Sequence, residues 1–255
     1  MTPYSIVEGP ADAPVLVLAN SLGSTVDMWE PQLPVLTRRY RVVRFDTRGH
    51  GRSAVPHGPY SIGDLGGDVL ALLDELGVAR AHFCGLSLGG MVGIWLAAHA
   101  PERIDRLVLC CTSARPAAPE SWAHRAATVR AEGTEAVADL VVSRWLTPEY
   151  ASRNPELVTS LRTMLAGTPA EGYASCCAVI GSLDLTPVLP RITAPTLVLH
   201  GADDPAIVPA HGADIAAAVP GARLVLLRDA AHLANVEQAA AFTTLIAEHL
   251  GNGHE

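Results

Sequence analysis

The sequence predicts an α/β fold, in which a mostly parallel central sheet is flanked by helices and carries an inserted helical lid. Short apolar runs of strand length alternate with helical patterns up to residue 113 and again after residue 187. Between them, residues 114–186 show helical patterns punctuated by prolines. We therefore expect a core of residues 1–113 and 187–255 with a lid of residues 114–186. A chain of 255 residues that is 49% hydrophobic is long enough for one large core.

The expected strands are continuous apolar runs, and each is followed by polar or small residues. They cover residues 15–19, 41–45, 81–84, 106–110, 196–200 and 224–227, and the expected core helices cover residues 29–40, 62–76, 90–100 and 236–250. Strands that alternate with helices pair in parallel, so their carboxyl ends meet at one edge of the sheet. We expect the reactive groups of the protein at that edge.

A glycine-rich turn joins the expected strand at 81–84 to the helix at 90–100. It places Ser87 between Gly85 and Gly89, in the pattern Gly-x-Ser-x-Gly. Glycines at these two positions let the strand and the helix pack closely, which leaves the serine in a strained and accessible turn. The N–H of Leu88 then lies at a helix N-terminus, where negative charge is stabilised. The pattern alone also fits a serine without a catalytic role, so the presence of an acid and a histidine at the right places decides whether Ser87 is catalytic.

An acid and a histidine follow this serine in the order that would activate it. Asp204 and His232 each come directly after one of the last two expected strands. A serine hydroxyl becomes nucleophilic when a histidine accepts its proton, and a carboxylate fixes the tautomer of that histidine. We therefore predict that Ser87, Asp204 and His232 are the catalytic residues. Asp203, on the same short loop, is the alternative acid.

Composition and charge exclude several function classes. The net charge of −8 and the lack of any basic run argue against nucleic acid and membranes as partners. All 18 basic residues are arginine, which excludes a Schiff-base lysine, a pyridoxal-phosphate anchor and a Walker A lysine. No apolar run reaches the ~20 residues that cross a bilayer, and no signal peptide is evident, so we expect a cytoplasmic protein. Its five cysteines lack metal-ligand spacing and fit small buried hydrophobes.

Particular strings of the chain resemble one family over nearly its whole length. They are Asn20-Ser21-Leu22-Gly23, Asp46-Thr47-Arg48-Gly49-His50-Gly51, Gly85-Leu86-Ser87-Leu88-Gly89-Gly90, Arg144-Trp145-Leu146-Thr147-Pro148, Gly172-Tyr173-Ala174-Ser175-Cys176-Cys177 and His232-Leu233-Ala234-Asn235-Val236-Glu237-Gln238. The second and third strings are shared across the α/β-hydrolases, whereas the last three are more particular. Together they resemble the 3-oxoadipate enol-lactonases (β-ketoadipate enol-lactone hydrolases) of bacterial aromatic catabolism.

This resemblance implies an α/β-hydrolase fold and the hydrolysis of a small anionic lactone, an enol-lactone with a carboxymethyl group, to 3-oxoadipate. It implies that Ser87 attacks the lactone carbonyl and that the N–H groups of Leu22 and Leu88 form the oxyanion hole. The family pattern Gly-x-x-Asp, counted from Gly201, selects Asp204. No metal or organic cofactor is implied, and the oligomeric state is left open.

An acidic protein needs a local cation to hold such an anionic substrate, and without lysine that cation is an arginine or a histidine. Arg125 lies three positions after Trp122, which places both on one helix face at about 100° per residue. Arg130 falls on the other side of the same face. We therefore predict Arg125 first and Arg130 second as substrate-binding residues, with Trp122 and Trp145 as walls of the pocket. The other lid arginines, taken as surface charges, are Arg115, Arg144, Arg153 and Arg162.

Three alternatives remain at this point. Another α/β-hydrolase, such as a carboxylesterase or a C–C hydrolase, has the same triad, and so does a non-catalytic ligand receptor on this fold. Ile207-Val208 stands where the lactonases often have Thr-Pro, beside the predicted acid. His50 is a rival base, but a histidine that precedes the serine is foreign to this fold, so we interpret its loop as structural.

Overall fold

The computed structural model describes residues 1–116 and 118–251, and a sheet of seven strands lies at the centre of this described part. The strand order is β1-β3-β2-β4-β5-β6-β7. All neighbouring strands pair in parallel except β1, which is antiparallel to β3. The strands are β1 (Ser5–Glu8), β2 (Val15–Ala19), β3 (Arg41–Phe45), β4 (Ala81–Leu86), β5 (Ile104–Cys110), β6 (Thr196–Gly201) and β7 (Arg223–Leu227). The predicted fold class is confirmed.

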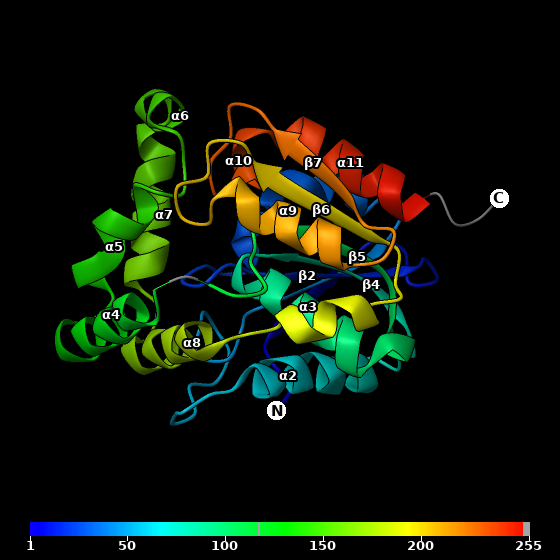
Figure 1. The fold of residues 1–255 in the computed structure, drawn as a ribbon, viewed down its shortest axis with the longest axis horizontal. Helices are drawn as coiled ribbons and strands as arrows, with labels where there is room; N and C mark the ends of the chain where they lie inside the picture. Colours follow the sequence, from blue (N-terminus) through cyan, green and yellow to red (C-terminus); the bar gives the residue numbers. More distant parts are fainter. Residues whose placement is uncertain (117, 252–255) are drawn as a thin grey trace.

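Helices cover both faces of the sheet (Figure 1). The helices on one face are η1 (Val26–Gln32), α1 (Leu33–Leu36), α10 (Ala234–Glu237) and α11 (Ala239–Gly251). Those on the other face are α2 (Ile62–Glu75), α3 (Leu88–His99), η3 (Thr186–Arg191) and α9 (Pro209–Ala218), and η2 (Pro101–Arg103) leads from α3 into β5. None of the helices in the described chain combines the length and apolar character needed to cross a membrane.

Between β5 and η3 the described chain forms five α-helices, which we call the helical insertion. They are α4 (Pro119–Glu132), α5 (Glu135–Val142), α6 (Pro148–Arg153), α7 (Pro155–Ala166) and α8 (Ala170–Ser182). In Figure 1 they lie together at one end of the sheet, with α4 packed on α8 and α5 on α7. All five helices lie within residues 114–186, the range over which the sequence predicted a lid.

Several elements differ from the sequence patterns. The helix expected over residues 29–40 is a 3₁₀ helix followed by a single α-turn, with Pro31 inside η1. Proline has no N–H to donate, so it does not support a continuous α-helix there. The helix expected over residues 236–250 is divided at Gln238, whose backbone leaves the helical region at φ −118°. Neither the short edge strand β1 nor the helix α9 was expected.

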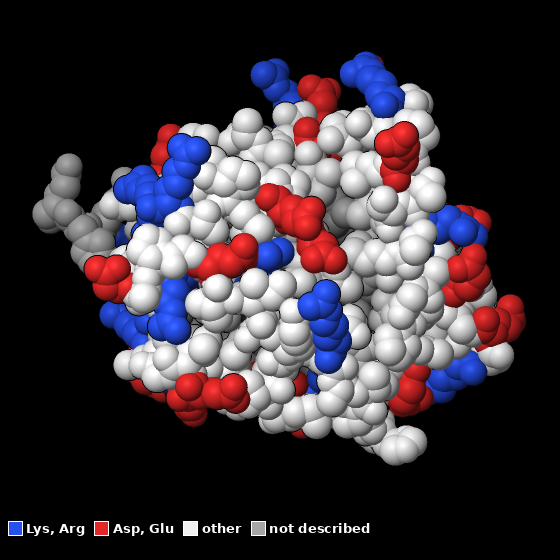
Figure 2. All heavy atoms as spheres, turned by 180° about the vertical axis from the view of Figure 1, so that it is seen from behind, with Lys and Arg blue, Asp and Glu red and all other residues white. Residues whose placement is uncertain are grey.

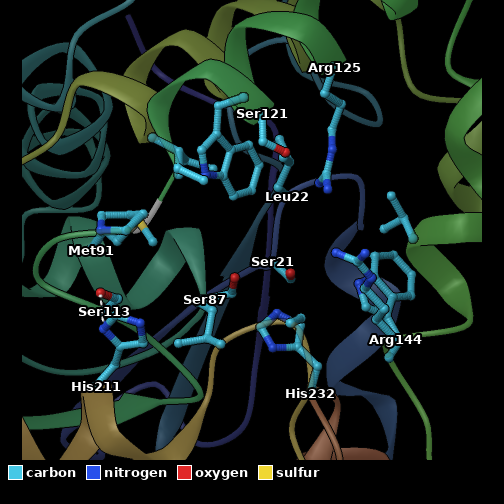
Figure 3. Close-up of a pocket in the computed structure, with 18 of the residues that line it drawn as sticks. Ser21, Leu22, Ser87, Met91, Ser113, Ser121, Arg125, Arg144, His211 and His232 are labelled. Atoms are coloured by element: carbon cyan, nitrogen blue, oxygen red, sulfur yellow. Dashed lines mark hydrogen bonds between the residues drawn. The ribbon is translucent and has the colours of Figure 1, made fainter.

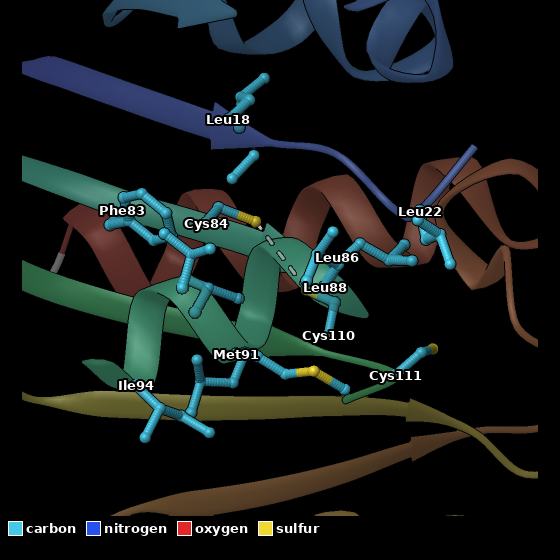
Figure 4. Close-up of a cluster of buried hydrophobic side chains, with 14 of the residues drawn as sticks. Leu18, Leu22, Phe83, Cys84, Leu86, Leu88, Met91, Ile94, Cys110 and Cys111 are labelled. Atoms are coloured by element: carbon cyan, nitrogen blue, oxygen red, sulfur yellow. Dashed lines mark hydrogen bonds between the residues drawn. The ribbon is translucent and has the colours of Figure 1, made fainter. Parts of the chain in front are cut away.

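The helix α3 after Ser87 is buried on nearly all sides (Figure 4). It can lie close to the sheet because Gly93 faces Phe83, where an added Cβ would come within 2.9 Å of the ring. Cys84 and Cys110 face each other beneath this helix with their sulfurs 3.8 Å apart. All five cysteines are free and buried, and burial raises the pKa of the Cys177 thiol to about 12. They therefore behave as small apolar residues, as expected.

The loop after β3 connects neighbouring elements of the core through hydrogen bonds of Asp46 and Arg48. Asp46 accepts hydrogen bonds from the N–H groups of Val26 and Arg52, both at 2.9 Å. The Arg48 guanidinium donates hydrogen bonds to both carboxylate oxygens of Asp68 on α2, each at 2.6 Å. His50 is wholly buried, and this burial lowers its pKa to about 4. The loop thus fixes β3 against its neighbours, which supports the structural interpretation over a base at His50.

Candidate active site

A cavity of about 240 Å³ lies between the carboxyl edge of the sheet and the helical insertion. Loops that follow the strands form one wall, and residues of α4, α8 and the loop after α5 form the other (Figure 3). Ser87, His232 and Leu22 line the core side. Trp122 and Trp145 line the insertion side, where the sequence had placed them.

The turn that carries Ser87 is as strained as the glycine spacing predicts. Ser87 has φ 57°, a left-handed conformation that non-glycine residues rarely adopt. A Cβ on Gly85 would lie 2.1 Å from the carbonyl oxygen of Gly89, and a Cβ on Gly89 would lie 2.3 Å from that of Ala19. Side chains at either glycine would push the helix α3 away from the sheet. The turn therefore needs both glycines to hold the serine at the cavity.

Two backbone N–H groups are free to face an oxyanion beside Ser87. Leu88 is the first residue of α3, and Leu22 follows β2 at the cavity. Within the described residues neither N–H donates to a backbone or side-chain acceptor. The N–H of Gly89 donates to the carbonyl of Asn20 at 3.0 Å, which holds the two loops together. This is the donor geometry that acyl-transfer sites use, and here it depends on backbone alone.

Asn20 stands where α/β-hydrolases, which the sequence resembles, usually have the histidine of a His-Gly-x-Gly loop, and its side chain holds the loop in place. Its side-chain amide donates to the carbonyl of Phe45 at 2.8 Å, and its carbonyl oxygen accepts from the indole N–H of Trp29 at 3.0 Å. Asn20 is completely buried. The departure from the common loop sequence therefore fixes the loop from behind and leaves its N–H groups where they are needed.

His232 is paired with Asp204. The His232 Nδ1–H donates to Asp204 Oδ2 at 2.8 Å, and both side chains are buried. The other carboxylate oxygen accepts the N–H groups of Ala206 and Ile207 at 2.8 and 3.0 Å. Asp203, the alternative acid, is exposed. A carboxylate fixed in this way holds the imidazole with Nε2 toward the cavity.

Ser87 and His232 face the same cavity (Figure 3), although no hydrogen bond joins them in the part of the chain that the structure describes. Catalytic hydrogen bonds of this kind are often long without substrate and shorten in the complex. Behind them, the Nε2–H of His200 donates to the carbonyl of Ile207 at 2.7 Å, and burial lowers the pKa of His200. His200 therefore packs behind the acid loop as a neutral ring. No group of three or more potential metal ligands occurs among the described residues.

The loop of His232 is tied to the helical insertion by a buried carboxylate. Glu237 Oε1 accepts both the N–H and the hydroxyl of Thr147, at 2.8 and 2.7 Å. Its other oxygen accepts the N–H of Ala231 at 2.6 Å. In addition, the N–H of Leu233 donates to the carbonyl of Trp145 at 2.8 Å. Leu233 is thus bonded to the insertion segment directly, and Ala231 is linked to it through Glu237.

The cations of the cavity come from the insertion. On the face shown in Figure 2 acidic and basic side chains are interspersed, and the net charge of −8 gives an anion no general attraction. Among the described lining residues the cations are Arg125 and Arg144, both of which Figure 3 shows beside the cavity. The Arg125 guanidinium lies 4.6 Å from the centre of the Trp122 ring. This stacking holds the charge in the lining of the cavity.

Arg130, the second candidate from the sequence, does not reach the cavity. Its guanidinium pairs with Glu171 of α8 at 2.9 Å, and this hydrogen bond is the main reason why the pKa of Glu171 falls to about 2. Arg130 is exposed and lies where α4 meets α8, so the helical angle did not place it at the cavity. Arg144, which the sequence analysis took as a surface charge, also lines the cavity, and so does His211, which it did not select. The position of Arg144 directly before Trp145, a predicted wall of the pocket, is the sequence feature that could have identified it.

A model of the α/β-hydrolase fold matches residues 14–239. The chain belongs to this family. The hydrolase is 43% identical to 3-oxoadipate enol-lactonase 2 of Acinetobacter baylyi, over 92% of this chain and 87% of the relative. It superposes on the crystal structure of the enol-lactonase from Burkholderia xenovorans LB400 with a TM-score of 0.96 at 47% identity, which covers 98% of this chain and 96% of the other. The resemblance inferred from the sequence strings is confirmed.

A thermophilic esterase from Thermogutta terrifontis, solved with malate bound, is a more distant structural neighbour of this hydrolase. The two superpose with a TM-score of 0.92 at 30% identity, over 99% of this chain and 94% of the esterase. The similarity thus extends through the helical insertion as well as the core. It also shows that the same architecture occurs in a protein described as an esterase.

Proposed function

We propose that this hydrolase is a 3-oxoadipate enol-lactonase, which opens the lactone ring of 3-oxoadipate enol-lactone and releases 3-oxoadipate. One observation carries the proposal most directly. Ser87 and His232, the latter paired with Asp204, line one cavity with two arginines, in a chain that is 43% identical to a 3-oxoadipate enol-lactonase over most of its length. The triad supplies hydrolysis, and the arginines supply recognition of an anion.

The reaction follows from this geometry in two stages. Ser87 Oγ bonds to the lactone carbonyl carbon while His232 accepts its proton, and the N–H groups of Leu22 and Leu88 bind the oxyanion. The ring C–O bond then breaks, and His232 returns the proton to the ring oxygen, which leaves as an enol and tautomerises to the ketone. Water, deprotonated by His232, next attacks the acyl carbon, and the bond to Ser87 breaks as His232 returns the proton to Ser87 Oγ. Asp204 stabilises the imidazolium in both stages.

The insertion side of the cavity would hold the rest of the substrate. Arg125 and Arg144 are the groups that can pair with the carboxymethyl carboxylate, and Trp122 and Trp145 wall the ring. The predicted use of Arg130 is replaced here by Arg144. The cytoplasmic location predicted from the sequence is part of the proposal, and five free thiols suit a reducing compartment.

The direct test is to follow loss of the ultraviolet absorbance of the enol-lactone on addition of the protein, with mass detection of 3-oxoadipate. We expect saturable turnover that disappears in Ser87→Ala. Absence of turnover, with the lactone bound or unbound, contradicts the proposal.

A carboxylesterase is the second candidate, because the structural neighbour from Thermogutta terrifontis is described as an esterase. The two activities are separated by the ratio of kcat/KM for the enol-lactone to kcat/KM for p-nitrophenyl acetate. An enol-lactonase gives a ratio far above one, since only the lactone carries a carboxylate for the cavity arginines. A ratio below one favours the esterase.

A further inference from the structure

Opening a ring poses a problem that the hydrolysis of an open-chain ester does not. In the proposed lactonase reaction, on which this inference rests, the leaving oxygen stays attached to the acyl chain. It departs beside His232, which protonates it, and the water that completes the reaction must occupy the same place. The opened chain therefore has to turn away from His232 and be held there. A hydrogen-bond donor on the opposite side of Ser87 would serve this purpose.

His211 occupies that side of the cavity. It lies in the first turn of α9 and lines the cavity together with Ser87 and His232. In Figure 3, Ser87 lies between the rings of His211 and His232. The His211 Nδ1 is 3.0 Å from the hydroxyl oxygen of Ser113, and the other ring nitrogen lies on the side of Ser87.

The hydrogen bonds around Ser113 determine which nitrogen of His211 carries the proton. Ser113 is buried, with 1% of its surface exposed, and its oxygen already accepts the N–H of Arg115 at 3.1 Å. Its hydroxyl hydrogen needs an acceptor, and within the described chain His211 Nδ1 is the acceptor in reach. A hydroxyl that donates to Nδ1 requires the neutral tautomer with the proton on Nε2. His211 thus presents an N–H donor to the cavity.

We propose that His211, oriented by Ser113, binds the ketone oxygen of the opened chain while the acyl group is attached to Ser87. A ketone oxygen only accepts hydrogen bonds, which matches the donor at His211 Nε2. With the chain held on this side, the position beside His232 is open to water and the ring cannot close again. His211 is then a substrate-binding residue for the second stage of the reaction and has no part in the attack by Ser87.

Two p-nitrophenyl esters of equal chain length test this assignment. The 4-oxopentanoyl ester gives an acyl group with a ketone at the position of the ring oxygen, and the pentanoyl ester gives the same chain without it. Rapid mixing separates the burst of p-nitrophenol, which reports acylation, from the steady rate, which reports deacylation. In His211→Phe we expect deacylation of the 4-oxopentanoyl enzyme to slow by roughly 3- to 10-fold, the effect of one uncharged hydrogen bond. The burst and the pentanoyl ester are expected to be unaffected.

Matched variants control for the substitutions themselves. Ser113→Ala removes the hydroxyl that orients His211 and is expected to slow the same step by a smaller factor. His124→Phe on α4 and Ser182→Ala at the end of α8 alter exposed residues outside the cavity lining, and both esters are expected to react with them as with the wild type. Equal slowing of both esters in His211→Phe, or of neither, overturns the assignment. The two esters test the role of His211 without the enol-lactone. A protein that cleaves the esters but not the enol-lactone therefore refutes the proposed function and leaves the test of His211 valid.

Discussion

The two walls of the cavity are built in different ways. On the core wall, each reactive group is fixed by hydrogen bonds or by backbone strain, as with the buried Asp204–His232 pair and Ser87 at φ 57°. On the insertion wall, Arg125 is half-buried and rests on an aromatic ring, and Arg144 is exposed. Rigid positioning is what bond making requires, whereas recognition of a carboxylate tolerates adjustable cations. We infer that changes in the core wall alter kcat and changes in the insertion wall alter KM.

The largest expected effect comes from Ser87→Ala. Removing the nucleophile should lower kcat by about 10⁴-fold or more, since the oxyanion hole and binding then act alone. The melting temperature should stay close to that of the wild type, because the side chain lost is small. A serine-directed phosphonate followed by peptide mapping provides the check, with Ser87 as the labelled residue. Labelling of any other serine contradicts the assignment.

Replacement of the acid should have the next largest effect on the core wall. Asp204→Asn offers an amide N–H to His232, which favours the wrong tautomer and should lower kcat by about 10³- to 10⁴-fold. Asp203→Asn is the matched control on the same loop, and its exposed side chain predicts little change. Steady-state kinetics of both variants decide between the two acids. A greater loss in Asp203→Asn would reject the pairing seen in the structure.

On the insertion wall the effect should be smaller and of another kind. Arg125→Met removes a charged partner of the substrate carboxylate and should raise KM for the enol-lactone roughly 10- to 100-fold. Hydrolysis of the neutral p-nitrophenyl acetate should change little. Arg144→Met is expected to act in the same direction.

Arg130→Met is the matched control for this pair, because its guanidinium faces Glu171 outside the cavity. We expect the KM values of Arg130→Met to equal those of the wild type for both substrates. If Arg125→Met harms both substrates equally, Arg125 supports the insertion instead of the substrate. That result would remove the distinction drawn between the two walls.

The smallest expected effect lies at the junction of the two walls. Thr147→Val removes the hydroxyl bonded to Glu237 and the N-terminal cap of α6, at a cost of about 1 to 2 kcal/mol in the free energy of unfolding. Thr147→Ser retains both contacts and should be close to the wild type. Denaturant unfolding of the pair measures the difference. Equal stability of the two variants would mean that the Thr147 hydroxyl contributes nothing measurable.

The core site was predictable because local sequence determines it. The turn that carries Ser87 needs Gly85 and Gly89 for steric reasons, so its sequence determines its backbone conformation. Strand order then brings Asp204 and His232 to the same edge. The family pattern Gly-x-x-Asp selected Asp204 over Asp203, and in the structure Asp204 pairs with His232 whereas Asp203 is exposed.

The insertion was less predictable because its contacts are between helices. The angle around α4 placed Arg125 correctly at the cavity, but it could not show that α8 brings Glu171 against Arg130. His211 was missed for a related reason. Its role depends on Ser113, which is 98 positions away in the chain. Spacing within one element contains no information about such partners.

The carboxylate of Glu237 has a consequence for attempts to exchange parts between relatives. A chimaera that takes residues 114–186 from another hydrolase replaces Thr147 but keeps Glu237 and the loop that carries His232. An incoming segment without a hydroxyl and a free N–H at that point would leave one oxygen of a buried carboxylate without its donors. Modular transfer of substrate preference therefore depends on a compatible pair at positions 147 and 237, and the natural unit of exchange is the insertion together with the loop after β7.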